Sequence, residues 1–180
     1  MRILREDTAA LLIDVQERLL PAIDKAEETL ALTARLIKGL QILEIPVVAV
    51  RQYPKGLGDL PRQLQEVLGQ YTPSDKVTFS AWDTEEIARR IRSLGKKNLV
   101  VFGTEAHVCV LQTVIDLIAA GYNVVLVADC VGSRRPYDRE IALRRAEKEG
   151  ALLTTSESIL FELLRKAATD TFKQISALVK

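Results

Sequence analysis

Three side chains in the sequence could together carry out nucleophilic chemistry: the carboxylate of Asp14, the ammonium of Lys76 and the thiol of Cys109. A thiol needs a base to remove its proton, and a carboxylate held ionised by an ammonium can serve as that base. Cys109 also lies at a predicted helix N-terminus, where the amide dipoles favour the thiolate. The alternative is structural: Cys109 as a small buried side chain, Asp14 as the cap of a turn and Lys76 as a surface amine.

The numbers of His and Cys residues limit the kinds of metal site that the chain could form. The chain has 180 residues, with one His, His107, and two Cys, Cys109 and Cys130. A two-histidine metal site and a four-cysteine zinc site are therefore excluded, and a chain of this length needs no disulfide. The formal net charge is +1, from 25 Lys and Arg against 24 Asp and Glu, so no overall field attracts a nucleic acid or an anionic membrane. We expect a small-molecule substrate, no metal and no cofactor.

The hydrophobic pattern predicts the elements that position these side chains. Hydrophobic residues make up 48% of the chain, and short aliphatic runs alternate with amphipathic stretches, which predicts one α/β domain over residues 1–180. Charged residues interrupt the first apolar run, so we expect no signal peptide or membrane span and a cytoplasmic location. The predicted strands are 9–14, 47–51, 76–79, 98–103, 123–129 and 151–154. The predicted helices are 22–44, 62–68, 84–94, 108–120, 137–149, one capped by Ser156, and 170–180.

Six strands with interleaved helices predict a parallel sheet covered on both faces, which is a three-layer α/β/α fold. Ligands bind such a sheet at the carboxyl ends of its strands. Residues near those ends are candidates for substrate binding, and each has a structural alternative. Trp82 could pack in the core, His107 could hold a turn or a subunit contact, and Arg134 could hold a substrate carboxylate. The full candidate set is Gln16, Gln52, Tyr53, Phe79, Trp82, His107 and Arg134.

Three sequence blocks resemble the isochorismatase-like cysteine hydrolase superfamily. They are LLIDVQE around Asp14, DKVTFSAW around Lys76 and GTEAHVCV over residues 103–110. The resemblance runs over roughly residues 7–165 in the order and spacing of the family. Further similarity in RQYPKGLG, ADCVGSRRPYDRE and TTSES is greatest to the isochorismatase-domain-containing branch, whose substrate is uncertain.

The resemblance implies a fold and a set of roles. The fold is a six-stranded parallel sheet in the Rossmann-like order 3-2-1-4-5-6. Cys109 would be the nucleophile, Asp14 its base and Lys76 the supporting cation. A non-proline cis peptide bond would join Thr104 to Glu105, and the backbone amides of Glu105 and Cys109 would face a developing oxyanion.

Two departures from the family limit the reaction. Nicotinamidases of this family carry a metal site of Asp and His residues after the second strand, whereas this chain reads QYPK at residues 52–55. True isochorismatases lack the nucleophilic thiol, so Cys109 disfavours hydrolysis of a vinyl ether. The sequence predicts a metal-independent hydrolase of a small amide, carbamoyl or related carbonyl compound.

Two other classes of function stay open. A non-catalytic, oligomeric or ligand-sensing protein would carry an ordinary thiol at Cys109, whereas the enzyme should have a lowered thiol pKa and fast alkylation near neutral pH. A redox-sensing thiol would need Cys130 within disulfide reach. Family members commonly assemble, so we expect a homo-oligomer, with the apolar residues of helix 170–180 as a candidate contact.

Overall fold

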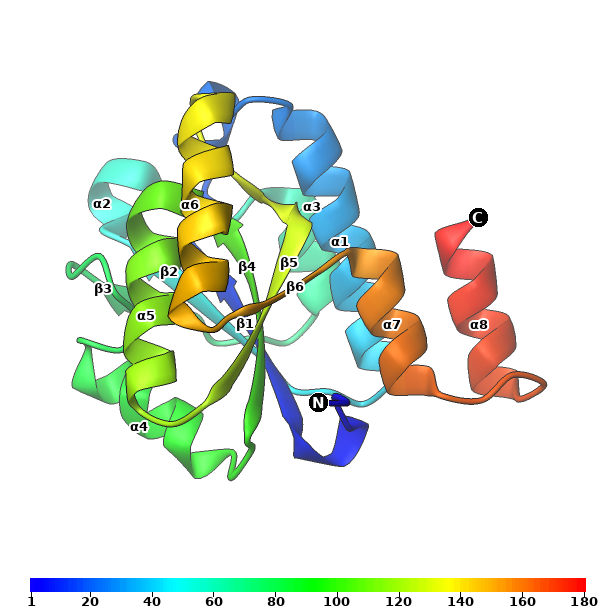
Figure 1. Cartoon of the computed structure of the whole chain (residues 1–180). Helices are drawn as coiled ribbons and strands as arrows, with labels where there is room; N and C mark the ends of the chain where they lie inside the picture. The colour runs from blue at the N-terminus through cyan, green and yellow to red at the C-terminus, as the bar shows by residue number, and fades with distance from the viewer.

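Six parallel strands form the centre of the protein (Figure 1). The computed structural model describes residues 1–180, and the strand order is β3-β2-β1-β4-β5-β6. Every neighbouring pair is parallel. The predicted α/β class, and the order 3-2-1-4-5-6 that the family resemblance implied, are confirmed. The strands are β1 (Thr8–Ile13), β2 (Val47–Gln52), β3 (Ser74–Lys76), β4 (Asn98–Thr104), β5 (Asn123–Gly132) and β6 (Leu152–Thr154).

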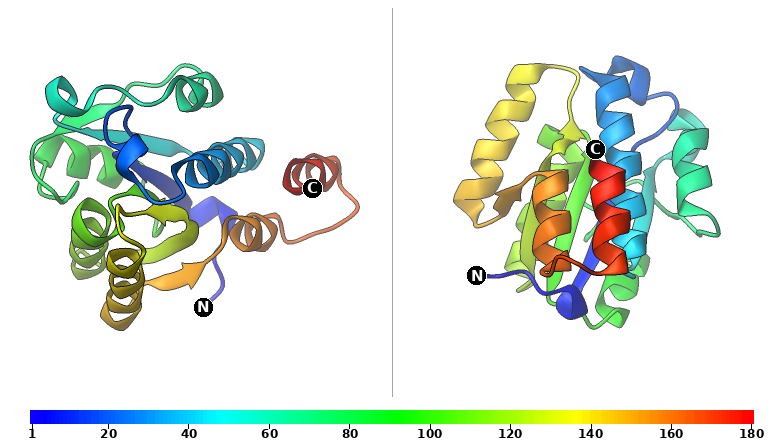
Figure 2. Two further views of the ribbon diagram at one scale, coloured as in Figure 1. Left: turned by 90° about the horizontal axis from the view of Figure 1, so that it is seen from above. Right: turned by 90° about the vertical axis from the view of Figure 1, so that its right-hand side faces the viewer.

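Helices cover both faces of the sheet (Figure 2). Helices α1 and α7 lie on one face with α8 packed outside them, while α5 and α6 lie on the other face. Every helix is too short or too polar to span a lipid bilayer. The α-helices are α1 (Ala26–Ile42), α2 (Pro54–Leu57), α3 (Arg62–Leu68), α4 (Glu85–Ser93), α5 (Leu111–Ala119), α6 (Pro136–Glu149), α7 (Ser156–Leu164) and α8 (Asp170–Val179). Two 3-10 turns, Arg5–Asp7 and Leu20–Ala22, and a π-helical segment, Ala106–Val110, complete the elements.

The burial of the two central strands, β1 and β4, explains why the sequence predicts their positions. Every residue of β1 and β4 is buried, because helices cover both of their faces. Such strands select continuous aliphatic runs instead of alternation, and AALLI and NLVVF are runs of this kind. Side chains from both faces join one core cluster of 46 buried residues. This core holds the carboxyl ends of β1 and β4 in a fixed relation.

The edge strand β3 is shorter and earlier than predicted. It spans Ser74–Lys76 instead of residues 76–79. The backbone leaves the sheet after Lys76 because its ammonium turns to bond the carbonyls of Thr78 and Phe79. Arg51 on β2 ties β3 in place through bonds of 2.7 and 3.0 Å to the Asp75 carboxylate.

Other boundaries also differ from the prediction. The predicted helix 22–44 begins at Ala26 and ends at Ile42, and the 3-10 turn Leu20–Ala22 is separate from it. β5 continues to Gly132, three residues further than expected. The helix that carries Cys109 begins as the π-helical segment Ala106–Val110. Thr155, not Ser156, caps α7, because its hydroxyl accepts the Ser158 N–H at 3.3 Å. Ser156 instead donates its hydroxyl and its backbone N–H to Asp129, at 2.6 and 2.7 Å.

The terminal helix α8 packs within its own chain. Ile175 is fully buried in the core, and the ring of Phe172 lies 6.4 Å from that of Phe161 on α7. Val179 also packs against the core cluster. The apolar residues Phe172, Ile175 and Val179 thus pack within the chain, and a subunit contact through α8 stays a prediction.

Candidate active site

The structure brings Asp14, Lys76 and Cys109 together at the carboxyl ends of β1, β3 and β4. Lys76 Nζ lies 2.7 Å from Asp14 Oδ2, and both side chains are 0% exposed. The Cys109 thiol is near enough for the charges of both groups to shift its pKa. The three side chains come from segments up to 95 residues apart, as the numbering of Asp14 and Cys109 shows (109 − 14).

Four oxygen atoms surround the Lys76 ammonium. Besides Asp14 Oδ2, they are Gln52 Oε1 at 2.6 Å, the Phe79 carbonyl at 3.1 Å and the Thr78 carbonyl at 3.3 Å. A buried ammonium is tolerated when its charge and its donors are matched in this way. Lys76 is therefore fixed in orientation, and its charge is directed at the Asp14 carboxylate.

Asp14 has one oxygen bound and one free. Oδ2 accepts from Lys76, whereas Oδ1 is buried without a hydrogen-bond partner. Burial raises the pKa of Asp14, and the charge and hydrogen bond of Lys76 oppose that rise. The backbone at Asp14 has φ of +50°, a left-handed conformation that non-glycine residues seldom adopt and that clusters at functional sites. A buried carboxylate with a free oxygen and a raised pKa is suited to accept a proton.

The Cys109 thiol is protonated at rest, which corrects the expected direction of its pKa. Burial, and after it the negative charge of Asp14, raises the pKa of Cys109 to about 12, and the opposing effect of Lys76 is smaller. The residue is 6% exposed. Because the helix N-terminus does not outweigh burial, a lowered thiol pKa in the resting protein was the wrong expectation. A thiol in this state needs a base to remove its proton before it can act as a nucleophile.

A glycine allows β4 to approach β1 at the site. A Cβ atom at Gly103 would lie 2.0 Å from the Ile13 carbonyl oxygen, and Gly103 has φ of +130°. No other residue fits this approach. It places Thr104 so that its hydroxyl donates to the Asp14 carbonyl at 2.7 Å. The next peptide bond, between Thr104 and Glu105, is cis, as the family resemblance implied.

Two of the expected substrate-binding residues, Gln52 and Phe79, bond to the Lys76 ammonium, and the Tyr53 N–H donates to the Lys76 backbone carbonyl. Gln52 accepts from Lys76 and donates to the Val77 carbonyl at 2.9 Å, so its amide is occupied. Phe79 contacts Lys76 through its backbone carbonyl, while its side chain is exposed. Tyr53 follows Gln52 with φ of +37° and an exposed ring. Of the three, the rings of Phe79 and Tyr53 are free to meet a ligand.

Gln16 is a structural residue and not a substrate contact. Its side chain is fully buried, and Nε2 donates to the carbonyls of Gln52 at 3.0 Å and Gly58 at 2.7 Å. Its Oε1 accepts the Gln52 N–H at 2.7 Å. The amide joins the loop after β1 to the end of β2, which leaves no polar atom of Gln16 for a ligand.

Trp82 also lies away from the site. Its ring makes an edge contact with Tyr122, with centroids 5.5 Å apart, and stacks under the Arg92 guanidinium at 5.2 Å. Arg92 lies in the last turn of α4 and Tyr122 after α5. Both of these helix ends adjoin the amino ends of the strands, so core packing was the correct alternative for Trp82.

His107 and Arg134 are both engaged by the protein itself. His107 Nδ1 lies 3.0 Å from Ser133 Oγ, and Nε2 lies 4.0 Å from Asp138 Oδ2. Arg134 Nε donates to Glu105 Oε2 at 3.0 Å. Arg134 is thus paired with a carboxylate of its own chain, which competes with the expected capture of a substrate carboxylate.

Sequence reasoning missed Thr113, which joins two parts of the site. Its hydroxyl donates to the Cys109 carbonyl at 2.7 Å and accepts the Ala81 N–H at 2.9 Å. The helix that bears the thiol is therefore linked to the segment that follows Lys76. A threonine four residues after a candidate nucleophile on the same helix is the available signal, because such hydroxyls bond the carbonyl one turn back.

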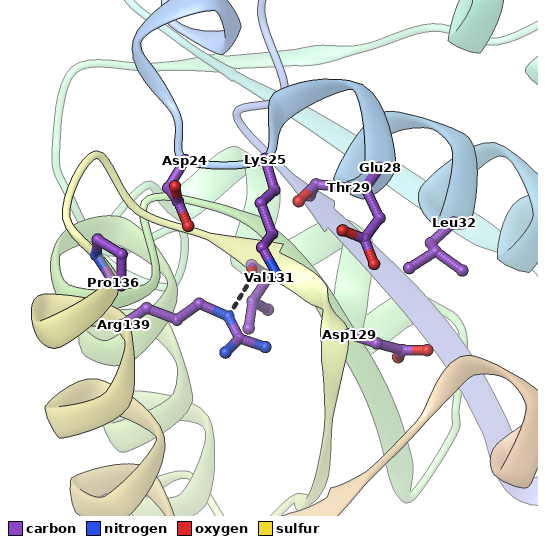
Figure 3. Close-up of a pocket in the computed structure, with 9 residues that line it drawn as sticks. All are labelled: Asp24, Lys25, Glu28, Thr29, Leu32, Asp129, Val131, Pro136 and Arg139. Atoms are coloured by element: carbon purple, nitrogen blue, oxygen red, sulfur yellow. Dashed lines mark hydrogen bonds between the residues drawn. The ribbon is translucent and has the colours of Figure 1, made fainter.

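A separate polar cavity of about 430 Å³ lies between the start of α1, the end of β5 and α6 (Figure 3). Arg139 crosses it to donate to the Val131 carbonyl at 2.9 Å. None of Asp14, Lys76 and Cys109 lines this cavity. No group of three or more His, Cys, Asp or Glu side chains is arranged to hold a metal ion.

A comparison of the sequence with models of known protein families shows which family the chain belongs to. The family model for the isochorismatase domain matches residues 8–158. The chain belongs to the isochorismatase family. The six-stranded sheet described above is the hydrolase fold of this family.

Isochorismatase-family relatives match most of the chain. Isochorismatase domain-containing protein 1 of Danio rerio is 40% identical over 167 residues, which is 93% of this chain. The chain spans 59% of the length of that relative. Isochorismatase domain-containing protein 2 of Xenopus laevis is 36% identical, with 93% of this chain and 81% of the relative covered.

Solved structures of the family agree in fold. The structure named MAR1 ribonuclease from Caenorhabditis elegans has a TM-score of 0.90 and 38% identity, covering 99% of this chain and 92% of that one. YcaC from Pseudomonas aeruginosa, with hexane-2,5-diol and covalent acrylamide, has a TM-score of 0.92 and 26% identity over 98% of this chain and 91% of that one.

Proposed function

We propose that the chain is a metal-independent cysteine hydrolase that cleaves a small amide, carbamoyl or related carbonyl compound through a thioester on Cys109. The observation that carries the proposal is the buried Asp14 carboxylate, which is bound on one oxygen by Lys76 and free on the other. A thiol whose pKa is raised needs such a base beside it.

The first half of the reaction forms the thioester. Asp14 Oδ1 takes the proton of Cys109 Sγ as the sulfur attacks the carbonyl carbon. The carbonyl oxygen becomes an oxyanion, which the backbone amides of Glu105 and Cys109 stabilise. As the oxyanion collapses, the carbon–nitrogen bond breaks and Asp14 returns the proton to the leaving nitrogen.

The second half releases the acid. Water attacks the thioester carbon while Asp14 accepts its proton. The carbon–sulfur bond then breaks, and the sulfur takes the proton back from Asp14. Lys76 takes no part in these proton transfers, and its role is to stabilise the ionised carboxylate and to orient it.

The substrate class follows from the site and the relatives. Cys109 is 6% exposed, so only a small electrophile reaches its sulfur. The covalent acrylamide of the Pseudomonas protein supports a reactive nucleophile on this fold, because nucleophiles such as thiolates add to the alkene of acrylamide. The ribonuclease name of the nematode structure points elsewhere, but a net charge of +1 gives little of the attraction to phosphates that RNA binding needs. We also propose that the protein acts as a homo-oligomer, which sedimentation can test.

A panel of small amides and ureas tests the proposal by release of ammonia. The wild-type protein should release ammonia from at least one compound, and Cys109→Ala should release none. Cys130→Ala is the matched control, because Cys130 is the other buried thiol of the chain and lies beside Asp129 instead of Asp14. Turnover that persists in Cys109→Ala contradicts the proposal. Cleavage of RNA without turnover of any amide contradicts it as well.

A further inference from the structure

The turn that leads from β4 to Cys109 is tied to the loop between β5 and α6 by two adjacent contacts. Glu105 Oε2 accepts from the backbone N–H of Arg134 at 3.1 Å and from Arg134 Nε at 3.0 Å. His107 Nδ1 lies 3.0 Å from Ser133 Oγ. Consecutive residues of the loop, Ser133 and Arg134, thus hold two side chains of the turn. The loop from Ser133 to Arg134, with these contacts, is called the clamp below.

The clamp also bonds to the segment before α1, which holds it from outside the turn. The Ser133 carbonyl accepts the Asp24 N–H at 3.0 Å, and Ser133 is 1% exposed. Glu105 is nearly as buried, with 10% of its side chain exposed, whereas 59% of the Arg134 side chain is exposed. A buried carboxylate that accepts a backbone N–H and a guanidinium N–H makes stronger bonds than an exposed ion pair. Because Glu105 is buried and the Arg134 side chain is largely exposed, this contact restrains the turn before Cys109 more than it restrains the Arg134 side chain.

An irregularity in β5 places the clamp. Residues 123–126 of β5 pair with residues 98–101 of β4, but the next pairs are Gly103 with Val131 and Thr104 with Gly132. The extra residues of β5 form a bulge. Arg139 donates to the carbonyl of Ala128 within the bulge and to the carbonyl of Val131, where pairing resumes. The chain resumes pairing directly beside the turn, so the next two residues meet His107 and Glu105.

We propose that Arg134 and His107 are positioning residues that hold the backbone of residues 104–109 in place to receive the oxyanion. The proposal rests on the proposed function, in which the amides of Glu105 and Cys109 bind that oxyanion. Neither Arg134 nor His107 bonds to Asp14 or Lys76, so loss of the clamp should leave the ionisation of the thiol unchanged. Arg134 is then not a substrate anchor, and His107 is not a proton carrier.

Two small probes separate these effects. Iodoacetamide alkylates the thiol by displacement at a saturated carbon and forms no oxyanion, so its rate reports proton removal and access. The ester p-nitrophenyl acetate acylates the thiol through a tetrahedral oxyanion, so its burst rate also needs the amides. We expect Arg134→Ala to slow acylation about 10-fold and Glu105→Ala about 100-fold, since outright loss of one oxyanion donor costs about 10²–10³-fold. Alkylation should keep its wild-type rate in both variants.

A pair of substitutions at His107 tests positioning against proton transfer. His107→Asn can keep a polar nitrogen near the Nδ1 position and so retain the bond to Ser133, although it cannot titrate. We expect His107→Asn to acylate at close to the wild-type rate and His107→Ala to acylate about 10-fold more slowly. Arg135→Ala is the matched control for Arg134→Ala, because Arg135 is exposed and its side chain bonds to nothing. It should leave both rates unchanged.

The outcomes distinguish the clamp from the proposed function. A wild-type protein that is alkylated but never acylated would contradict the proposed function and the clamp together. Acylation by the wild type with unchanged acylation by Arg134→Ala contradicts the clamp alone. So does a parallel fall in acylation and alkylation, or His107→Asn as slow as His107→Ala. If Glu105→Ala does not fold, the substitutions at Arg134 and His107 still decide the matter.

Discussion

Removing the Lys76 ammonium should destabilise the protein in a way that depends on pH. Lys76→Met keeps the buried stem but leaves Asp14 without its partner at 2.7 Å. Breaking a buried ion pair from one side costs about 3–5 kcal/mol, because the remaining charge is unpaired. We expect a loss of this size in the free energy of unfolding at a pH where the Asp14 carboxyl is ionised.

The direction with pH follows from the pKa of Asp14. Burial already raises this pKa, and the charge and hydrogen bond of Lys76 oppose the rise. Lys76→Met removes the opposition, so the pKa rises further. A group whose folded pKa is raised contributes stability while it is protonated, and that stability is lost as the pH rises through the folded pKa. The penalty of Lys76→Met should therefore shrink as the pH falls, by up to about 1.4 kcal/mol per pH unit below that pKa.

Urea unfolding of the wild type and the variant, followed by circular dichroism at about pH 5 and about pH 8, measures this difference. The double variant Asp14→Asn with Lys76→Met is the control, because it has no carboxyl at this position. The free energy of unfolding of Lys76→Met should fall relative to that of the double variant as the pH rises, since only Lys76→Met has a carboxyl with a raised pKa. A penalty below about 1 kcal/mol for Lys76→Met, or one that is equal at both pH values, would refute the reasoning about this buried pair.

Three further predictions concern the residues around the pair. Asp14→Asn should lower the pKa of the Cys109 thiol, because the negative charge of Asp14 raises it. The pH profile of iodoacetamide alkylation should therefore move to lower pH, while acylation by p-nitrophenyl acetate is lost. An unmoved profile would show that Asp14 does not act on the thiol. Gly103→Ala should lower the free energy of unfolding in urea by about 3 kcal/mol or more, since its Cβ would meet the Ile13 carbonyl at 2.0 Å. The control Gly69→Ala, at a residue with φ of +65° but open space around it, should lower it by only about 1 kcal/mol. Equal losses in the two variants would argue against the close approach of β4 to β1. Gln16→Ala should lose about 2–3 kcal/mol because it strands buried backbone groups; a raised KM for the cleaved amide with unchanged stability would return Gln16 to substrate binding.

The strands of the fold could be predicted from the sequence where burial alone decides the residue types. β1 and β4 are covered on both faces, so their continuous aliphatic runs identified them as strands, and the 3.6-residue pattern identified α1. The end of β3 could not be predicted from the sequence. The strand ends at Lys76, where the carbonyls of Thr78 and Phe79 accept from the Lys76 ammonium instead of continuing the sheet. Local pattern carries no information on such a contact.

The candidate site was predictable in its members and less so in its surroundings. Asp14, Lys76 and Cys109 each follow or end a strand, and parallel strands bring such positions to one edge. The partners of Gln16, His107 and Arg134 lie 26 or more residues away in sequence, so their occupied polar atoms appear only in the fold. The direction of the Cys109 pKa likewise depends on how deeply the turn is buried, which the helix N-terminus did not reveal.

The most direct test of the account is the mass of the protein stopped in acid during its reaction with p-nitrophenyl acetate. We predict one added acetyl group, located on Cys109 by peptide mapping, with Cys130 unmodified and no adduct in Cys109→Ala. An adduct on another residue, or an unmodified protein during turnover, would contradict the claim that Cys109 is the nucleophile.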